Sequence, residues 1–248
     1  MLTVSQLHGF NALPSGGTAP AAAPNPDHAW RFYGLPASLD DAVGSAHFTG
    51  FGNWETASGI NDQAVEMSAG SEYLARAGGI FGTSEYTLTG WFSASHSNAN
   101  AADDISVLSV FRITNGTYYV EFRLDHESSP YQSWQPYFDH DGTVESGSLG
   151  RFPAIQNGWN FFAIRRDTSN NLKLFINSDS HEHTDPAVTD GAGLFINGFS
   201  TMQAVTGFPD DFLYIDELYH WDDELSDENI AWLYNGGAGR FVNGFGQF

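Results

Sequence analysis

The stretch LYIDELYHWDDELSDENIAWLYNGG, residues 213–237, combines a strand, an acidic turn and a short helix, and it decides the fold. Apolar residues alternate with other residues over its first part, which predicts a β-strand with one buried face. Asp216 and His220 lie on the opposite face of this strand. The predicted inward positions are Leu213, Ile215, Tyr219 and Trp221.

The second part of this stretch predicts a helix over residues 226–234. Ser226 is a favourable N-cap residue, and acidic residues in the first turn suit the helix dipole. Leu225 before the cap can pack onto Ile230, and two glycines from Gly236 onward end the helix. The apolar face of the helix consists of Ile230, Leu233 and Tyr234. The strand residues expected beneath it are Ile215, Leu218 and Tyr219.

Three further segments predict strands. Residues 86–92 (YTLTGWF) form one strand, and residues 159–177 (WNFFAIRRDTSNNLKLFIN) form two strands joined by a polar turn at 167–171. In residues 118–125, the apolar positions Val120, Phe122 and Leu124 alternate with polar ones, which indicates a half-buried strand. The chain has no internal repeat and no second globular domain.

Composition excludes several classes of protein. The 248 residues include 41% hydrophobic residues, enough for a substantial core, and 30 acidic against 9 basic residues, for a net charge of −21. Such a charge repels nucleic acid and anionic membranes. There is no cysteine and no apolar run of membrane-spanning length. The first residues lack the pattern of a signal peptide, so we expect synthesis in a cytoplasm without export by that route.

Residues 1–28 are predicted to form an extended arm rich in proline and alanine, and residues 29–248 form the domain. The arm is either a disordered tail or a segment that becomes ordered against a partner. In the second case its apolar anchors are Leu2, Val4, Leu7 and Phe10.

Five segments in a fixed order resemble a laminin-G-like domain of the concanavalin A-like jelly-roll superfamily. They are AWRFYG (29–34) with the polar loop at 39–42, INDQAVEMSAGSEYL (60–74) and the three segments at 86–92, 159–177 and 213–237. The resemblance covers residues 29–237. It implies an all-β jelly-roll sandwich of two antiparallel sheets, with one short C-terminal helix and the extended N-terminal arm.

The resemblance also implies a structural calcium ion. Its predicted ligand is Asp216, with Asp40 and Asp41 in the early loop as further ligands, since carboxylates and carbonyls are the usual ligands of Ca²⁺. The alternative is that Asp216 points into solvent.

No enzymatic activity is predicted. The related β-glucanases carry three carboxylates in the pattern Glu-x-Asp-x-x-Glu, and the nearest residues here, Glu121, Asp125 and Glu127, do not match it. Sugar binding remains open, because aromatic and acidic or amide residues lie in or beside predicted loops. These are Trp54, Tyr131, Trp134, Tyr137, Asp139, Asp141 and Asn157, which could equally be packing residues.

The predicted function is that of a bacteriophage virion protein, a capsid decoration or fibre-like surface protein attached through its arm. The segment LHGFNA (residues 7–12) resembles N-terminal stretches of phage structural proteins. The expected partners are major capsid or tail proteins, further copies of the chain and host surface glycans, and the expected location is the virion, after synthesis in the host cytoplasm. The alternatives are a carbohydrate-binding lectin or adhesin used in host attachment, and a divergent glycosidase.

Overall fold

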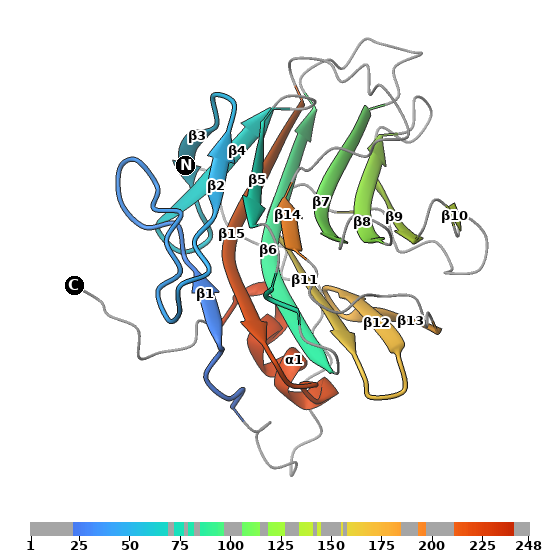
Figure 1. The fold of residues 1–248 in the computed structure, drawn as a ribbon. Helices are drawn as coiled ribbons and strands as arrows, with labels where there is room; N and C mark the ends of the chain where they lie inside the picture. Colours follow the sequence, from blue (N-terminus) through green and yellow to red (C-terminus); the bar gives the residue numbers. More distant parts are fainter. Residues whose placement is uncertain are drawn as a thin grey trace, which may run out of the picture.

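Two antiparallel β-sheets make up most of the described chain (Figure 1). The computed structural model describes residues 22–68, 72–76, 79–81, 85–96, 106–114, 119–126, 134–140, 143–144, 155, 158–184, 193–196 and 211–240. The prediction of an all-β sandwich of two antiparallel sheets with one short C-terminal helix is confirmed.

Sheets A and B hold strands from distant parts of the chain. In spatial order, sheet A contains β13 (Asp179–Thr184), β12 (Asn171–Ile176), β11 (Asn160–Arg166), β6 (Tyr86–His96), β15 (Asp211–Trp221), β4 (Gln63–Ser68) and β3 (Glu55–Ser58), and β1 (His28–Trp30) also pairs with β15. Sheet B contains β10 (Thr143–Val144), β9 (Trp134–His140), β8 (Tyr119–His126), β7 (Ser106–Thr114), β14 (Gly193–Ile196), β5 (Tyr73–Arg76) and β2 (Thr49–Phe51).

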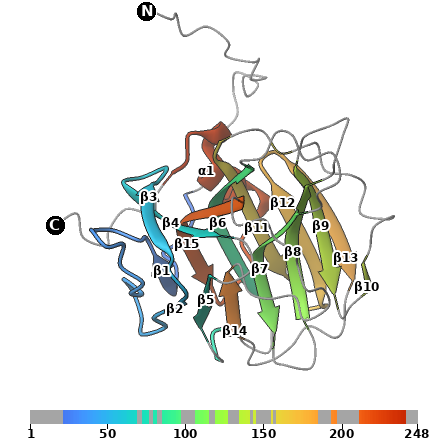
Figure 2. The same ribbon diagram turned by 90° about the horizontal axis from the view of Figure 1, so that it is seen from above.

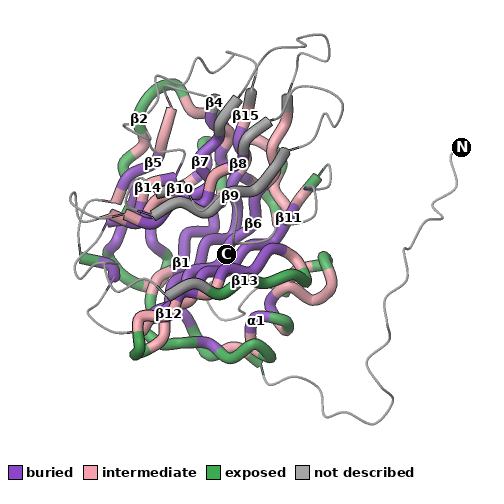
Figure 3. The backbone as a smooth tube through the Cα atoms, turned by 90° about the vertical axis from the view of Figure 1, so that its right-hand side faces the viewer, coloured by how far each residue is buried: buried purple, intermediate pink, exposed green. Residues whose placement is uncertain are grey.

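One hydrophobic core fills the space between the two sheets. The predicted alternation of β8 is confirmed, because Val120, Phe122 and Leu124 are all buried in this core. From sheet A, the ring of Phe162 lies 5.2 Å from that of Phe111 and 6.3 Å from that of Phe122. The central strands β6, β11 and β15 are buried along most of their length (Figure 3). The predicted strand pair around the polar turn is also confirmed as β11 and β12.

A β-bulge interrupts β15. Its pairing with β6 is regular as far as Asp216 and resumes at Tyr219, with a register shift between the two. Glu217, inside the bulge, adopts a left-handed backbone conformation with a φ of 51°. An extra residue in one strand shifts the inward and outward alternation of side chains beyond it.

This bulge corrects the face predicted for β15. Unbroken alternation predicts that residues 213, 215, 219 and 221 share one face of the strand. The sequence also predicts that Ile215 and Leu218 lie under the helix. Both predictions are wrong. Ile215 and Leu218 belong to the core between the sheets, whereas Tyr219 and Trp221 belong to a second cluster that includes the helix. The bulge therefore lets one strand contribute to two separate apolar layers.

The predicted helix is confirmed as α1 (Asp227–Tyr234), followed by the short η1 (Asn235–Gly237). The Ser226 hydroxyl accepts the Asn229 backbone N–H at 3.2 Å, and the Asn229 side chain accepts the Ser226 N–H at 3.3 Å. Asn235 ends the helix in a left-handed conformation. Ile230 and Leu233 are buried against sheet A, on its side away from sheet B (Figure 2). No helix within the described ranges is long and apolar enough to cross a membrane.

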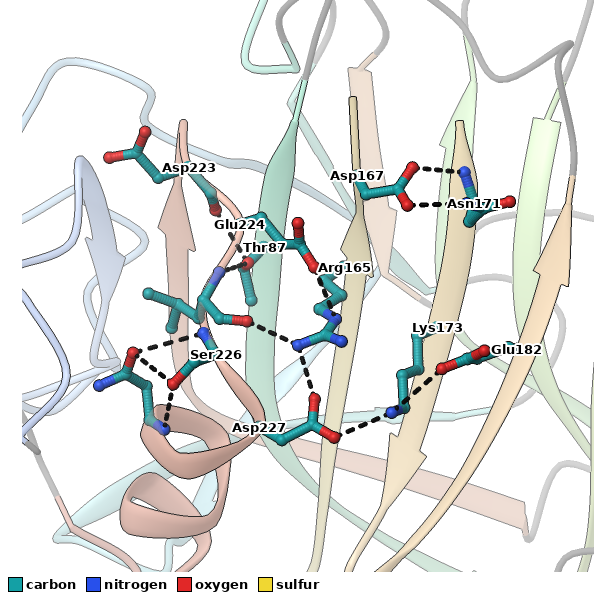
Figure 4. A network of polar contacts seen from close by, with 12 residues as sticks. Thr87, Arg165, Asp167, Asn171, Lys173, Glu182, Asp223, Glu224, Ser226 and Asp227 are labelled. Atoms are coloured by element: carbon teal, nitrogen blue, oxygen red, sulfur yellow. Dashed lines mark hydrogen bonds and ion pairs between the residues drawn. The ribbon is translucent and has the colours of Figure 1, made fainter. Parts of the chain in front are cut away.

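Polar contacts fix the turn before α1 to three strands of sheet A (Figure 4). Arg165 Nη1 donates to the carbonyl of Leu225 at 2.8 Å and lies 2.6 Å from Asp227 Oδ1. Lys173 Nζ donates to the other Asp227 oxygen at 2.9 Å, and the Thr87 hydroxyl accepts the Leu225 N–H at 2.9 Å. Partly exposed ion pairs contribute little stability, so these contacts mainly set the position of the helix.

The described end of the predicted arm packs against the domain. Trp221 Nε1 donates to the carbonyl of Pro24 at 3.0 Å, and the Asp27 N–H donates to the carbonyl of His220 at 2.8 Å. Residues 22–28 thus run beside β15 and contact the cluster under α1. The predicted assembly anchors lie outside the described residues; they are Leu2, Val4, Leu7 and Phe10.

Candidate functional site

Asp216, the predicted calcium ligand, is fully buried beneath the turn between β3 and β4. Its Oδ2 accepts the backbone N–H groups of Ile60 at 2.9 Å and Asn61 at 3.1 Å, and its Oδ1 accepts that of Glu217 at 2.8 Å. Burial and the adjacent Glu217 carboxylate raise the pKa of Asp216 to about 8. The alternative that Asp216 points into solvent is therefore wrong.

The other two predicted ligands belong to a different polar network. Asp41 accepts the backbone N–H of Ala29 and that of Ala46, each at 3.0 Å, and its Oδ2 lies 2.6 Å from the His28 ring. Although burial acts to raise it, hydrogen bonds from backbone N–H groups and from His28 lower the pKa of Asp41 to about 2. Asp40 is exposed and interacts with Ser38 and His47 instead.

These surroundings do not fit a calcium ion at Asp216. Ca²⁺ takes about six to eight oxygen ligands, whereas the groups around Asp216 are N–H donors whose hydrogens point at its oxygens. Among the residues that the structure describes, no group of three or more His, Cys, Asp or Glu could hold a metal ion. The hydrogen bonds make Asp216 a structural residue that joins β15 to the β3–β4 turn.

His220 is a buried histidine next to the Asp41 network. Its ring lies 5.6 Å from that of His28 and 4.9 Å from that of Phe81. Among the described residues, neither of its ring nitrogens has a hydrogen-bond partner. Burial, together with the nearby His28 ring, lowers the pKa of His220 to about 3 although Asp41 opposes the change.

Replacing His220 by phenylalanine is expected to reduce the amount by which the free energy of unfolding falls in acid. Below about pH 6.5 the unfolded chain protonates this ring, whereas the folded chain keeps it neutral down to about pH 3. The unfolded state then binds more protons, so this residue costs about 1.4 kcal/mol of stability for each pH unit below ~6.5. Urea denaturation of both proteins at pH 7.5 and pH 5 measures the difference, and equal losses would refute the assignment.

Sheet B brings some of the predicted sugar contacts together. Trp134, Tyr137 and Asp139 all belong to β9. In the register of the sheet, Tyr137 is opposite Arg123 of β8, and Asp139 is opposite Glu121. Tyr137 and Asp139 are thus each paired across the sheet with a charged residue of β8.

Trp54 occupies a separate position between β2 and β3. A β-carbon added at Gly50 would lie 2.1 Å from Trp54 Nε1, so the indole lies directly against the backbone of Gly50. The half-buried ring packs on the main core, an environment typical of a packing residue. The remaining predicted sugar contacts lie outside the described residues; they are Tyr131, Asp141 and Asn157.

Polar side chains of β7 and β8 point away from the core. Tyr119, Glu121 and Arg123 alternate with the inward residues of β8 and therefore lie on the outer face of sheet B. On β7, Arg112 is opposite Glu121, and Ser109 is opposite Arg123. The guanidinium carbon of Arg112 lies 4.0 Å from the centre of the Tyr119 ring. The result is a compact group of cationic, anionic and hydroxyl side chains.

Two members of this group are buried although they face outward. Glu121 has 1% of its surface exposed and Ser109 has 7%. Within the described part of the chain, the Ser109 hydroxyl has no hydrogen-bond partner.

Aromatic side chains occupy the other end of the same face. Phe51 of β2 is opposite Tyr73 of β5, and their rings stack at 4.5 Å with an interplanar angle of 10°. Phe51 is 40% exposed, which is unusual for a large apolar side chain in this structure. Phe195 of β14 is opposite Arg112, and β14 lies between β7 and β5, so Phe195 lies between the polar group and the aromatic pair. The outward residues Phe51, Tyr73, Phe195, Ser109, Arg112, Tyr119, Glu121 and Arg123 are called the sheet B face below.

Sequence reasoning found only part of the sheet B face. The alternation of β8 separates Glu121 and Arg123 from the buried residues, which signals an outer polar face. Phe51, Tyr73 and Arg112 gave no such signal, because each belongs to a different strand. Only the strand order of sheet B brings them together.

Comparison with known proteins shows the fold. No protein family profile and no curated protein sequence matches the chain. The structure is similar to domain 4 of AbnA, a GH43 extracellular arabinanase from Geobacillus stearothermophilus in complex with arabinotriose. The TM-score is 0.59 at 14% identity, and the similarity covers 87% of this chain and 98% of that domain.

Toxin binding domains have similar structures. The binding domain of Paraclostridial Mosquitocidal Protein 1 gives a TM-score of 0.59 at 11% identity, covering 86% of this chain and 52% of that one. The binding domain of botulinum neurotoxin serotype D gives 0.57 at 13% identity, with 86% and 52% covered. The chain therefore spans about half the length of these toxin domains. At such identities the similarity establishes a β-sandwich fold but does not identify a ligand.

Proposed function

We propose that this chain is a carbohydrate-binding module whose sugar ligand binds on the sheet B face. The observation that carries the proposal is the placement of a stacked aromatic pair and a polar group on one face, joined by Phe195. Aromatic rings contact the apolar faces of sugars, while a few positioned polar groups bind hydroxyls and fix orientation. The pair Phe51 and Tyr73 has the first role, and the partly exposed Arg112 and Arg123 have the second.

The structural neighbours support a sugar ligand. The AbnA domain was solved in complex with arabinotriose. Another neighbour, with a TM-score of 0.55 at 12% identity and 51% of its length covered, is botulinum neurotoxin type C, whose cell entry depends on interaction with two ganglioside molecules. This proposal corresponds to the lectin or adhesin alternative. A role in a phage virion and assembly through the arm stay predictions, because the arm anchors lie outside the described residues. That the protein is not an enzyme also stays a prediction.

Replacing Tyr73 by alanine is expected to weaken sugar binding about fivefold or more, because loss of a central aromatic anchor costs over ~1 kcal/mol. The matched control is Tyr214→Ala, since Tyr214 is also a half-buried strand tyrosine but lies on the outer face of sheet A. A glycan array first identifies the ligand, and calorimetric titration then compares the two variants with the parent protein.

The control should bind as the parent protein does. If Tyr73→Ala and Tyr214→Ala bind equally well, the ligand does not contact the sheet B face. If no glycan binds to the parent protein, the proposed function itself is wrong.

A further inference from the structure

Two adjacent carboxylates, Asp216 and Glu217, are fully buried at the bulge of β15. An unpaired buried charge is very costly, so any carboxylate that stays ionised here needs a compensating partner. The calcium ion that the sequence resemblance implies would be one source of that compensation. The N–H donors around Asp216 leave no place for a cation, so the compensating charge must come from the partners of Glu217.

Arg31 is the charged partner of Glu217. Its Nε lies 3.2 Å from Glu217 Oε2 and 3.4 Å from Oε1, and the Arg31 side chain is itself almost wholly buried. Its guanidinium carbon lies 4.6 Å from the centre of the Tyr33 ring, which favours a cation at this place. Arg31 thus puts a fixed positive charge beside the buried acids.

Neutral donors complete the surroundings of Glu217. Asn61 Nδ2 donates to Glu217 Oε1 at 2.7 Å, and the Tyr219 hydroxyl donates to Oε2. Together with the N–H groups at Asp216, these bonds engage all four carboxylate oxygens. Arg31 follows β1, Asn61 lies in the β3–β4 turn and Glu217 lies in β15, so the cluster joins three distant segments.

We propose that the Arg31 guanidinium takes the place of a structural cation in this domain and makes its stability independent of calcium. The left-handed backbone at Glu217 supports this role, because strained positions persist where surrounding contacts determine them. The arrangement does not depend on sugar binding, since the bulge belongs to sheet A and the proposed sugar site belongs to sheet B.

The test is thermal unfolding in excess calcium and in chelator for the full chain and three variants. The parent protein should have the same melting temperature in both solutions. Arg31→Met should melt roughly 6–20 °C lower, because it leaves a buried charge unpaired. Arg31→Met combined with Glu217→Met should recover most of this loss, because it removes both charges.

The control Arg240→Met changes an exposed arginine beside the Trp232 ring and should shift melting by less than about 2 °C. If Arg31→Met does not fold at all, the double variant still folds under this proposal. A melting temperature of the parent protein that rises by several degrees in calcium would overturn the proposal. So would a double variant no more stable than the single one, or an Arg31→Met variant as stable as the parent.

Discussion

Replacing Phe162 by alanine is expected to lower the free energy of unfolding by about 3–5 kcal/mol. Phe162 lies on β11 between the two sheets and is fully buried. Its ring is 5.2 Å from that of Phe111 in sheet B and 6.2 Å from that of Phe92 in sheet A. Opposite it, Gly90 has no side chain, and an added β-carbon there would lie 2.9 Å from the Phe162 ring. Such a closely packed site cannot collapse to fill the cavity.

Urea denaturation of Phe162→Ala beside Phe51→Ala measures this effect. Phe51 is the matched control, because it is also a strand phenylalanine but is 40% exposed. We expect its replacement to cost less than ~1 kcal/mol, since much of its surface is already in water. Similar losses in the two variants would contradict the placement of Phe162 at the centre of the core.

Replacing Leu233 by alanine is expected to cost about 2–5 kcal/mol, because Leu233 of α1 is buried in the cluster that covers the outer face of sheet A. This cluster includes Trp91 and Phe161, whose rings lie 5.3 Å apart. The control Glu228→Gln, on the exposed side of the helix, should change stability by less than about 0.5 kcal/mol. Chemical denaturation of the two variants measures both values.

The competing hypothesis treats α1 as a helix that binds a partner. It predicts that Leu233→Ala leaves the denaturation midpoint of the isolated chain unchanged and weakens only association. The buried Leu233 and the contacts of Arg165 and Lys173 with Asp227 favour a structural helix. A near-neutral Leu233→Ala would assign the helix to an interface instead.

Local signals in the sequence predicted the local structure well. Ser226 predicted the start of the helix correctly, because capping depends on a few neighbouring residues, whereas its end is capped by Asn235, one residue before the predicted Gly236. The polar turn at 167–171 fixed the β11–β12 pair for the same reason. The alternation in β8 identified Val120, Phe122 and Leu124 as core residues. Each of these features is determined within one short segment.

Features that depend on distant segments could not be predicted in this way. Unbroken alternation in β15 would put Glu217 on the apolar face and Leu218 on the polar face, but only the pairing with β6 shows where the register shifts. The burial of Asp216 depends on the β3–β4 turn, which is far away in the sequence. The sheet B face combines Phe51, Tyr73 and Arg112 only through the order of strands in the sheet. Register between distant strands is a property of the whole fold.

The most direct test of the proposed function is an NMR titration of the isotope-labelled protein with the oligosaccharide identified on the array. If the sugar binds on the sheet B face, backbone amide signals of β5, β7, β8 and β14 should shift in proportion to saturation. Signals of β11, β12 and α1, in and against sheet A, should stay unchanged. Shifts confined to sheet A or to α1 would contradict the account and place the sugar elsewhere.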